Sequence, residues 1–111
     1  MPIDYGGQSA EIIEINEIAQ KHGLSVIEDA APALGGIHKT KKVGSVSTMT
    51  GFSFGPDKNL NTGEGGLIVT NDDELAEKCK ILRKNGTDTR YHHVEIGWGA
   101  KMPDPNAALG I

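Results

Sequence analysis

The sequence predicts an α/β fold, because helix-like and strand-like stretches alternate along its 111 residues. An amphipathic stretch over residues 11–22 leads into a short apolar run over residues 25–28, which is typical of a helix followed by a buried strand. Two more strand-like runs follow at residues 47–54 and 66–70. Together these runs favour a sheet flanked by helices.

The first helix is expected over residues 11–22, with Ser9 as its N-cap and Gly23 as its stop. Its apolar face consists of Ile12, Ile15, Ile18 and Ala19. A helix followed directly by a buried strand is half of a βαβ unit.

The linker between the strand-like runs at residues 47–54 and 66–70 is too short for a helical crossover. We therefore expect these two strands to pair antiparallel, which makes the sheet mixed. The basic stretch at residues 38–43 is expected to form a small exposed hairpin.

A second helix is expected to start at residues 71–74, whose sequence resembles a capping box, and to end at Gly86. Its buried stripe is expected to consist of Leu75, Ala76, Cys79 and Leu82. Residues 87–101 are interpreted as an irregular surface loop, and residues 103–111 as the beginning of a third helix.

The charge and the cysteine content of the chain limit the binding partners and the compartment that we expect for it. A formal net charge of −4 disfavours binding to nucleic acid or to an anionic membrane surface, and no apolar run approaches the roughly 20 residues that span a bilayer. Cys79 is the single cysteine, so there is no disulfide framework, and a reducing cytoplasm fits best. His92 and His93 would face opposite ways on a strand, so no metal site is expected.

Three side chains with different chemistry lie at or just past the ends of expected strands, where open α/β sheets bind ligands. They are Asp29, Ser53 and Lys58. Pyridoxal phosphate requires a lysine that binds it covalently, a carboxylate beside its ring nitrogen, and hydroxyl or N–H groups around its phosphate. The three residues supply one member of each class.

Simpler interpretations exist for each residue taken alone. Lys58 is explained equally by a solvated surface lysine, and Asp29 by a carboxylate that caps a loop. Ser53 is explained by an inward hydroxyl bonded to the backbone, and residues 63–66 by a tight turn. The order and spacing of the surrounding sequence decide between these interpretations.

That surrounding sequence resembles the DegT/DnrJ/EryC1/StrS aminotransferases, over nearly the whole chain. The runs that carry the resemblance are Val26-Ile27-Glu28-Asp29-Ala30-Ala31, Val43-Gly44-Ser45, Phe52-Ser53-Phe54 with Lys58-Asn59, and Thr62-Gly63-Glu64-Gly65-Gly66. The resemblance implies part of the large pyridoxal-phosphate-binding domain of a fold type I enzyme, with a mixed, mostly parallel sheet. Residues 1–111 would form this partial domain, with its N-terminal part and the C-terminal small domain absent.

The resemblance also implies a reaction: amination of a nucleotide-linked keto sugar, with glutamate as the usual amino donor, in a homodimer. By this resemblance Lys58 would bind the cofactor covalently and act as general acid and base. Asp29 would pair with the pyridinium nitrogen, and Ser53 would hydrogen-bond the phosphate. Asn59 and Glu64 lie in the family's motif without an assigned role.

The chain departs from the family pattern at three places. Pro32 stands where members usually carry Gln or His against the cofactor. Gly99 and Lys101 stand around the place where members often carry an asparagine that reaches the cofactor phosphate of the partner subunit. Members are also several-fold longer, so we expect the 111 residues alone to be inactive.

Two other hypotheses remain open. One is a non-catalytic family relative with a regulatory or assembly role, which the departures at Pro32 and Gly99 favour. The other is a small α/β phosphoacceptor module with Asp29 at its strand end, although two clear helices are few for the roughly five βα units of such a domain.

Overall fold

The computed structural model describes residues 1–111 and contains one three-stranded sheet with three α-helices around it. The sheet order is β1-β4-β5, with strands at Ile27–Asp29, Met49–Ser53 and Gly66–Val69. β1 and β4 are parallel, whereas β4 and β5 are antiparallel. The α/β class, the mixed sheet and the antiparallel pairing of β4 with β5 are thus confirmed.

The remaining elements are short. A 3₁₀ turn at Tyr5–Gly7 precedes helix α1 at Ile12–Lys21, and α2 and α3 span Asp73–Leu82 and Asp104–Leu109. The expected basic hairpin is present as β2 at Ile37–His38 and β3 at Lys41–Lys42; a second hairpin pairs β6 at Thr87–Thr89 with β7 at His92–His93.

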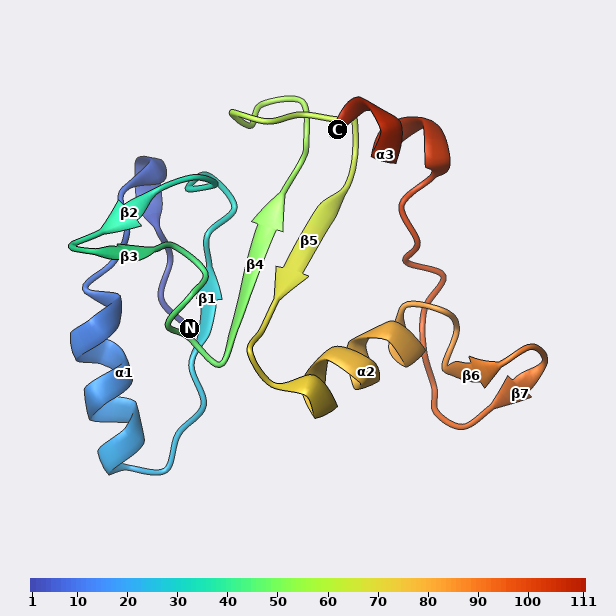
Figure 1. Ribbon diagram of the computed structural model, residues 1–111, viewed down its shortest axis with the longest axis horizontal. Coiled ribbons are helices and arrows are strands. Elements are labelled where there is room, and N and C mark those ends of the chain that lie inside the picture. The colour runs from blue at the N-terminus through green and yellow to red at the C-terminus, as the bar shows by residue number, and fades with distance from the viewer.

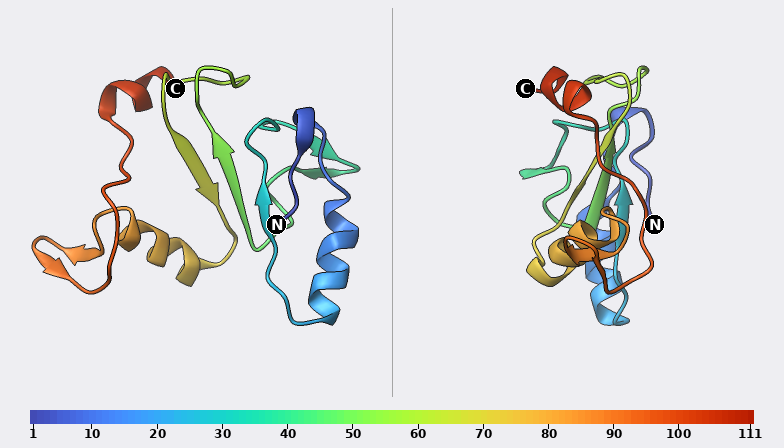
Figure 2. Two further views of the ribbon diagram at one scale, coloured as in Figure 1. Left: turned by 180° about the vertical axis from the view of Figure 1, so that it is seen from behind. Right: turned by 90° about the vertical axis from the view of Figure 1, so that its right-hand side faces the viewer.

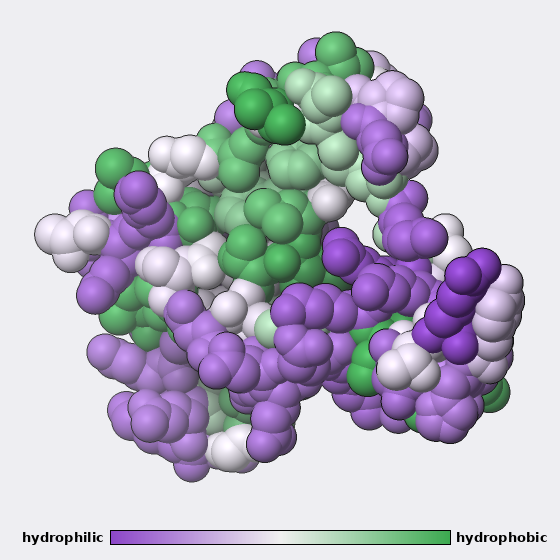
Figure 3. All heavy atoms as spheres, turned by 45° about the vertical axis from the view of Figure 1, so that its right-hand side comes forward, coloured by the Kyte–Doolittle hydropathy of each residue, from purple (hydrophilic) through white to green (hydrophobic).

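The elements lie largely side by side, so the molecule is thin. Its extents are 43 × 34 × 18 Å, and Figures 1 and 2 show α1 beyond β1 on one side of the sheet and α2 with the β6–β7 hairpin on the other. Only 13 of the 111 residues are buried, and Leu67 and Ile68 of β5 are about half exposed. An apolar area accordingly remains visible in the middle of the space-filling view (Figure 3).

Two small apolar clusters hold the elements together. Ile12 and Ala19 of α1 pack on Val26, which leads into β1. Ala30, Ala33 and Phe52 form the second cluster, between the loop after β1 and strand β4. The second cluster fixes the loop that follows Asp29 against the strand that carries Ser53.

Helix α1 ends where the sequence predicted, but the residue predicted to cap its start was wrong. Gly23 has a positive φ of 64°, a conformation that favours glycine and ends the helix. Ser9 is not the N-cap: its hydroxyl donates to the carbonyl of Ala10, and Glu11 occupies the cap position without a side-chain bond. The buried Asp4 instead accepts a hydrogen bond from the N–H of Ala10 (2.9 Å), because the 3₁₀ turn brings it beneath this segment.

The expected apolar stripes are less buried than the pattern indicated. Ile18 is 58% exposed and Ile27 51% exposed, because no element covers them. The stripe of α2 is only half-buried for the same reason.

Helix α2 starts as expected, because Asp72 Oδ1 accepts hydrogen bonds from the N–H groups of Glu74 and Leu75. It ends at Leu82, four residues before Gly86, since Asn85 and Gly86 both adopt positive φ and turn the chain. The expected irregular loop after it contains the β6–β7 hairpin, whose turn places Tyr91 at a φ of 66°.

Glu28 is buried on the face of β1 opposite to Asp29, where two hydroxyls hold it. Its Oε2 accepts hydrogen bonds from Thr50 Oγ1 (2.8 Å) and Ser47 Oγ (3.0 Å), and its side chain is 1% exposed. This cross-strand pairing ties β1 to β4 in the register that places Asp29 opposite Gly51.

Replacing Thr50 with valine keeps the side-chain shape but removes one donor from the buried carboxylate. We expect the free energy of unfolding to fall by about 1–3 kcal/mol, the usual cost of an unmet buried polar group. Urea unfolding of the full-length protein measures this, with the exposed Thr40→Val as the matched control. Equal stability of the two variants would show that Glu28 is satisfied without Thr50.

Candidate functional site

The site is built on the carboxyl ends of the two parallel strands. Asp29 is the last residue of β1 and pairs in register with Gly51 of β4, and Ser53 ends β4 two residues later. Residues two apart on a strand share a face, so Gly51 and Ser53 lie on the same side of the sheet. Asp29 and Ser53 therefore lie close together although 24 positions separate them in the chain.

Asp29, Gly51 and Ser53 line one cavity of about 320 Å³. Its walls are apolar and include Ile27, Met49 and Ile68. The cavity is open to solvent on one side, and an apolar cleft with a few convergent polar groups is the usual form of a small-molecule site.

Asp29 and Ser53 each have a hydrogen-bonding position that no protein group uses. Asp29 Oδ1 accepts a hydrogen bond from the N–H of Ala31 (3.2 Å), which holds the carboxylate at the strand end, while Oδ2 has no partner. Ser53 Oγ accepts a bond from the N–H of Gly55 (3.3 Å) and keeps its own proton to donate. One acceptor and one donor are thus available to a ligand.

Lys58 lies on the loop that follows β4 and does not line this cavity. Its Nζ donates to Asp57 Oδ2 at 2.7 Å, and this bond, together with nearby backbone hydrogen bonds, holds the pKa of Asp57 below its usual value. The Lys58 side chain is 21% exposed, and the Asp57 side chain 73% exposed. An ion pair with so exposed a carboxylate contributes little, so Lys58 can leave it at small cost.

Several hydrogen bonds fix the loop around Lys58. Asn59 Nδ2 donates to the carbonyl of Leu34 (2.9 Å), which links the lysine loop to the loop after Asp29. The buried Thr62 donates through Oγ1 to the carbonyl of Glu64 (2.9 Å), and its own carbonyl accepts from Asn106 of α3 (2.6 Å).

Thr62 and Asn106 were not singled out from the sequence as part of the site. Their 44-residue separation leaves no local pattern that pairs them. The sequence signal available was the family motif that contains Thr62, which gave no role to its side chain.

A larger cavity of about 860 Å³ lies between β5, α2 and residues 100–103. Its lining mixes apolar side chains with charged ones such as Lys80, Arg83 and Lys101, and it contains none of the three predicted site residues. The smaller cavity, which brings Asp29 and Ser53 together, is therefore the candidate site. No helix of the structure is both long enough and apolar enough to cross a bilayer.

The fold and the site together define an α/β sheet with a carboxylate and a hydroxyl at the ends of two parallel strands and a lysine on the loop that follows. The chain belongs to the DegT/DnrJ/EryC1/StrS aminotransferase family, whose sequence profile matches residues 1–111. This is a family of pyridoxal-phosphate-dependent enzymes.

Individual relatives match over almost all of the chain. It is 44% identical to the "Pleiotropic regulatory protein" of Geobacillus stearothermophilus, over 98% of the chain and 30% of the relative. It is 43% identical to the GDP-perosamine synthase of Caulobacter vibrioides, over 100% of the chain and 30% of that enzyme.

Among solved structures, Helicobacter pylori PseC, an aminotransferase involved in the biosynthesis of pseudoaminic acid, superimposes with a TM-score of 0.91. The sequence identity is 37%, and the match covers 97% of this chain and 30% of that one. The fold type expected from the sequence is confirmed by this likeness. The chain spans about 30% of the length of the relatives it matches.

Proposed function

We propose that the protein transfers an amino group from an amino acid, with glutamate as the donor, to a nucleotide-linked keto sugar, using pyridoxal phosphate. The observation that carries the proposal is the shared cavity of Asp29, Gly51 and Ser53 at the carboxyl ends of parallel strands. The relatives named for perosamine and pseudoaminic acid biosynthesis support the sugar substrate.

The donor set of the cavity fits the cofactor. Asp29 offers an unpartnered carboxylate oxygen, which would accept a hydrogen bond from a protonated ring nitrogen. Ser53 offers a hydroxyl proton, which would be donated to the phosphate. Bound in this way, pyridoxal phosphate supplies an electron sink for the carbon from which a proton is removed.

Lys58 would carry the proton transfers. Its amino group must leave the contact with Asp57 and give up a proton before its nitrogen can form a covalent bond. As a free amine, Lys58 Nζ would serve as the base that takes the proton from the amino donor's α-carbon and as the acid that returns it. Such general acid–base transfer contributes roughly 10²–10⁴-fold to a rate.

The large domain assigned to residues 1–111 is proposed to be incomplete, and this segment alone to be inactive. In it Lys58 is outside the cavity that holds Asp29 and Ser53. Pro32, where the family usually has a Gln or His, removes one polar side chain from the cofactor's surroundings.

We also propose that the protein is a homodimer in the cytoplasm. Tyr91, Ile96 and Trp98 are 80%, 90% and 67% exposed, and large apolar side chains gathered in one segment are typical of a surface covered by another chain. The single cysteine suits a reducing compartment. Analytical ultracentrifugation of the full-length protein should give twice the mass of one chain.

The activity is tested with the full-length protein, pyridoxal phosphate, glutamate and a panel of nucleotide-linked keto sugars. Formation of 2-oxoglutarate together with an amino sugar is the expected result, and glutamate consumption should depend on the sugar. A protein that binds the cofactor but aminates none of the sugars would contradict the proposed substrate class.

A non-catalytic regulatory role is the second candidate, because the relative at 44% identity carries a regulatory name and the chain has Pro32 and Gly99 at departures from the family pattern. The same assay separates the two candidates. Turnover of any keto sugar at an ordinary enzymatic rate excludes the non-catalytic role.

A larger side chain at Gly51, which lines the cavity, should weaken cofactor binding without preventing folding. A Cβ on Gly51 meets no atom within 4 Å, so Gly51→Val is expected to fold normally. Its branched side chain would occupy space between Asp29 and Ser53, and we expect cofactor affinity to fall at least about tenfold, which corresponds to roughly 1.4 kcal/mol. Titration with pyridoxal phosphate, followed by its visible absorbance, measures this affinity. Gly51→Ala adds a smaller side chain at the same position and should have a smaller effect. Unchanged affinity in the valine variant would place the cofactor elsewhere.

A further inference from the structure

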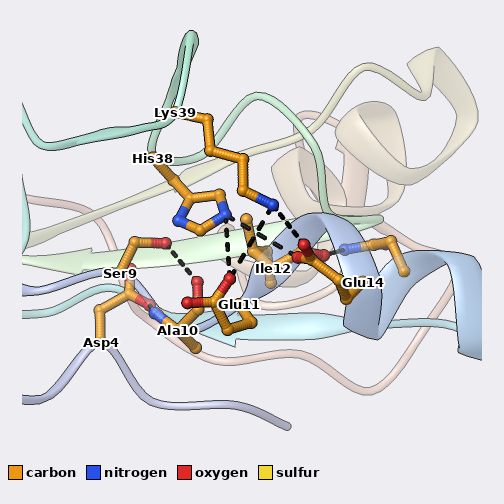
Figure 4. A network of polar contacts seen from close by, with 9 residues as sticks. Asp4, Ser9, Ala10, Glu11, Ile12, Glu14, His38 and Lys39 are labelled. Atoms are coloured by element: carbon orange, nitrogen blue, oxygen red, sulfur yellow. Dashed lines mark hydrogen bonds and ion pairs between the residues drawn. The ribbon is translucent and has the colours of Figure 1, made fainter.

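A histidine from the β2–β3 hairpin points between two carboxylates at the start of helix α1, one on its N-cap residue and one in its first turn, away from the proposed active site. Figure 4 shows His38 directed at Glu11 and Glu14, with Lys39 beside them. His38 Nε2 lies 3.7 Å from Glu11 Oε2 and 3.9 Å from Glu14 Oε2. One ligand atom from each of the three residues lies within 4.8 Å of the other two.

The histidine nitrogen is buried and has no hydrogen-bond partner. The His38 side chain is only 10% exposed, and its Nε2 accepts and donates no bond, although it faces two charged groups. Glu14 Oε2, the oxygen that faces it, is also a buried atom without a partner. Unmet buried polar atoms are rare in folded proteins, and two that face each other indicate a missing common partner.

A direct ion pair does not account for these distances. Charge-assisted N–H···O bonds are about 2.7–2.9 Å long, so both contacts of His38 are roughly 1 Å too long. Two ligand atoms on a tetrahedral zinc ion, each about 2.1 Å from the metal, lie about 3.4 Å apart. The two distances from His38 exceed this by only a few tenths of an ångström, and the ligand oxygens of Glu11 and Glu14 lie within 4.8 Å of each other. Rotations of the two exposed glutamate side chains would bring the three atoms to this spacing.

Lys39 orients one of the carboxylates. Its ammonium contacts Glu14 Oε1, the oxygen that faces away from His38, and this contact lowers the pKa of Glu14 and raises that of Lys39. One oxygen of Glu14 is thus engaged by Lys39, and the other, Oε2, is left facing the histidine. Partners of this kind, which hold a ligand from outside, are common around protein metal sites.

We propose that Glu11, Glu14 and His38 form a binding site for a divalent zinc ion. Three protein ligands of mixed nitrogen and oxygen type leave a fourth tetrahedral position for water. The ion would tie the β2–β3 hairpin to the first turn of α1, two elements that are otherwise joined here by exposed ion pairs. None of the three residues lines the cavity of Asp29 and Ser53, so the site is separate from the proposed catalysis.

The test is calorimetric titration of the full-length protein with Zn²⁺, in wild type and in two variants that each remove one ligand. Glu14→Gln keeps the side-chain shape, and His38→Ala removes the imidazole. Wild type should bind one ion that each variant binds at least about 10–100-fold more weakly. Co²⁺ titration should give the visible absorbance of a tetrahedral site in wild type and lose it in both variants.

Matched controls replace the same residue types outside the site. Glu17→Gln lies on the exposed part of the same helix, and His22→Ala lies just past its end. Both should bind the ion with wild-type affinity. Circular dichroism checks whether the two ligand variants are folded. If His38→Ala is unfolded, the comparison is made with Glu14→Gln alone.

Two outcomes overturn the proposal. One is the absence of saturable Zn²⁺ binding to the wild-type protein. The other is binding that is equally strong in Glu14→Gln, His38→Ala and the controls, which would assign the ion to another location.

Discussion

Replacing Lys58 with alanine in the full-length protein is expected to abolish covalent attachment of pyridoxal phosphate and to lower kcat by about 10⁴-fold or more. The reason is that no other amine lies on the loop after β4, so neither the covalent bond nor the proton transfer has a substitute. Visible absorbance of the bound cofactor, and borohydride reduction followed by peptide mapping, measure the attachment. The wild-type protein should carry the label at Lys58.

The neighbouring Asp57→Asn provides the matched control. Asp57 is exposed and only pairs with Lys58, so its variant should retain labelling and change kcat by no more than a few-fold. If the label persists in the Lys58→Ala protein, the lysine that binds the cofactor is a different one.

Replacing Asp29 with asparagine is expected to lower kcat by roughly 10²–10³-fold, the usual cost of removing one preorganised electrostatic contact in an active site. Asparagine keeps an oxygen for the N–H of Ala31, so the loop after β1 should hold its place. What is lost is the negative charge that would keep the ring nitrogen protonated. Steady-state kinetics should show the loss in kcat, with a smaller change in KM.

Two comparisons make this result specific. Asp73→Asn alters an exposed acid at the start of α2 and should leave kcat unchanged. Ser53→Ala should weaken cofactor binding more than it lowers the turnover of the loaded enzyme, since its proposed contact is with the phosphate. An Asp29→Asn enzyme that keeps wild-type kcat would rule out the proposed role of the carboxylate.

Local sequence was sufficient where a signal lies within a few residues. The capping-box-like sequence at residues 71–74 marked the start of α2, and Gly23 marked the end of α1. The short linker after residues 47–54 required the antiparallel pairing of β4 with β5. Each of these rests on backbone chemistry that neighbouring residues decide.

Errors arose where the packing of other segments, near or far in the chain, decides what a residue does. Ser9 is a residue type that often caps helices, but its hydroxyl donates to the carbonyl of Ala10. The N–H of Ala10 donates instead to Asp4, which precedes the 3₁₀ turn. Ile18 and Ile27 follow apolar patterns, yet they stay exposed because no element packs on them. Residue type predicts what a position can bury, whereas the neighbouring elements decide what it does bury.

The sequence alone determined the α/β class, the family and the identities of the three proposed site residues, because these are carried by ordered motifs along the chain. Tertiary structure decided which of them meet: parallel pairing of β1 with β4 brings Asp29 and Ser53 to one cavity and leaves Lys58 beside Asp57. It also placed His38 beside Glu11 and Glu14, a cluster that the spacing of these residues in the sequence does not predict. The physical reason is that strand register and loop packing set distances between side chains far apart in the chain, and local sequence does not encode those distances.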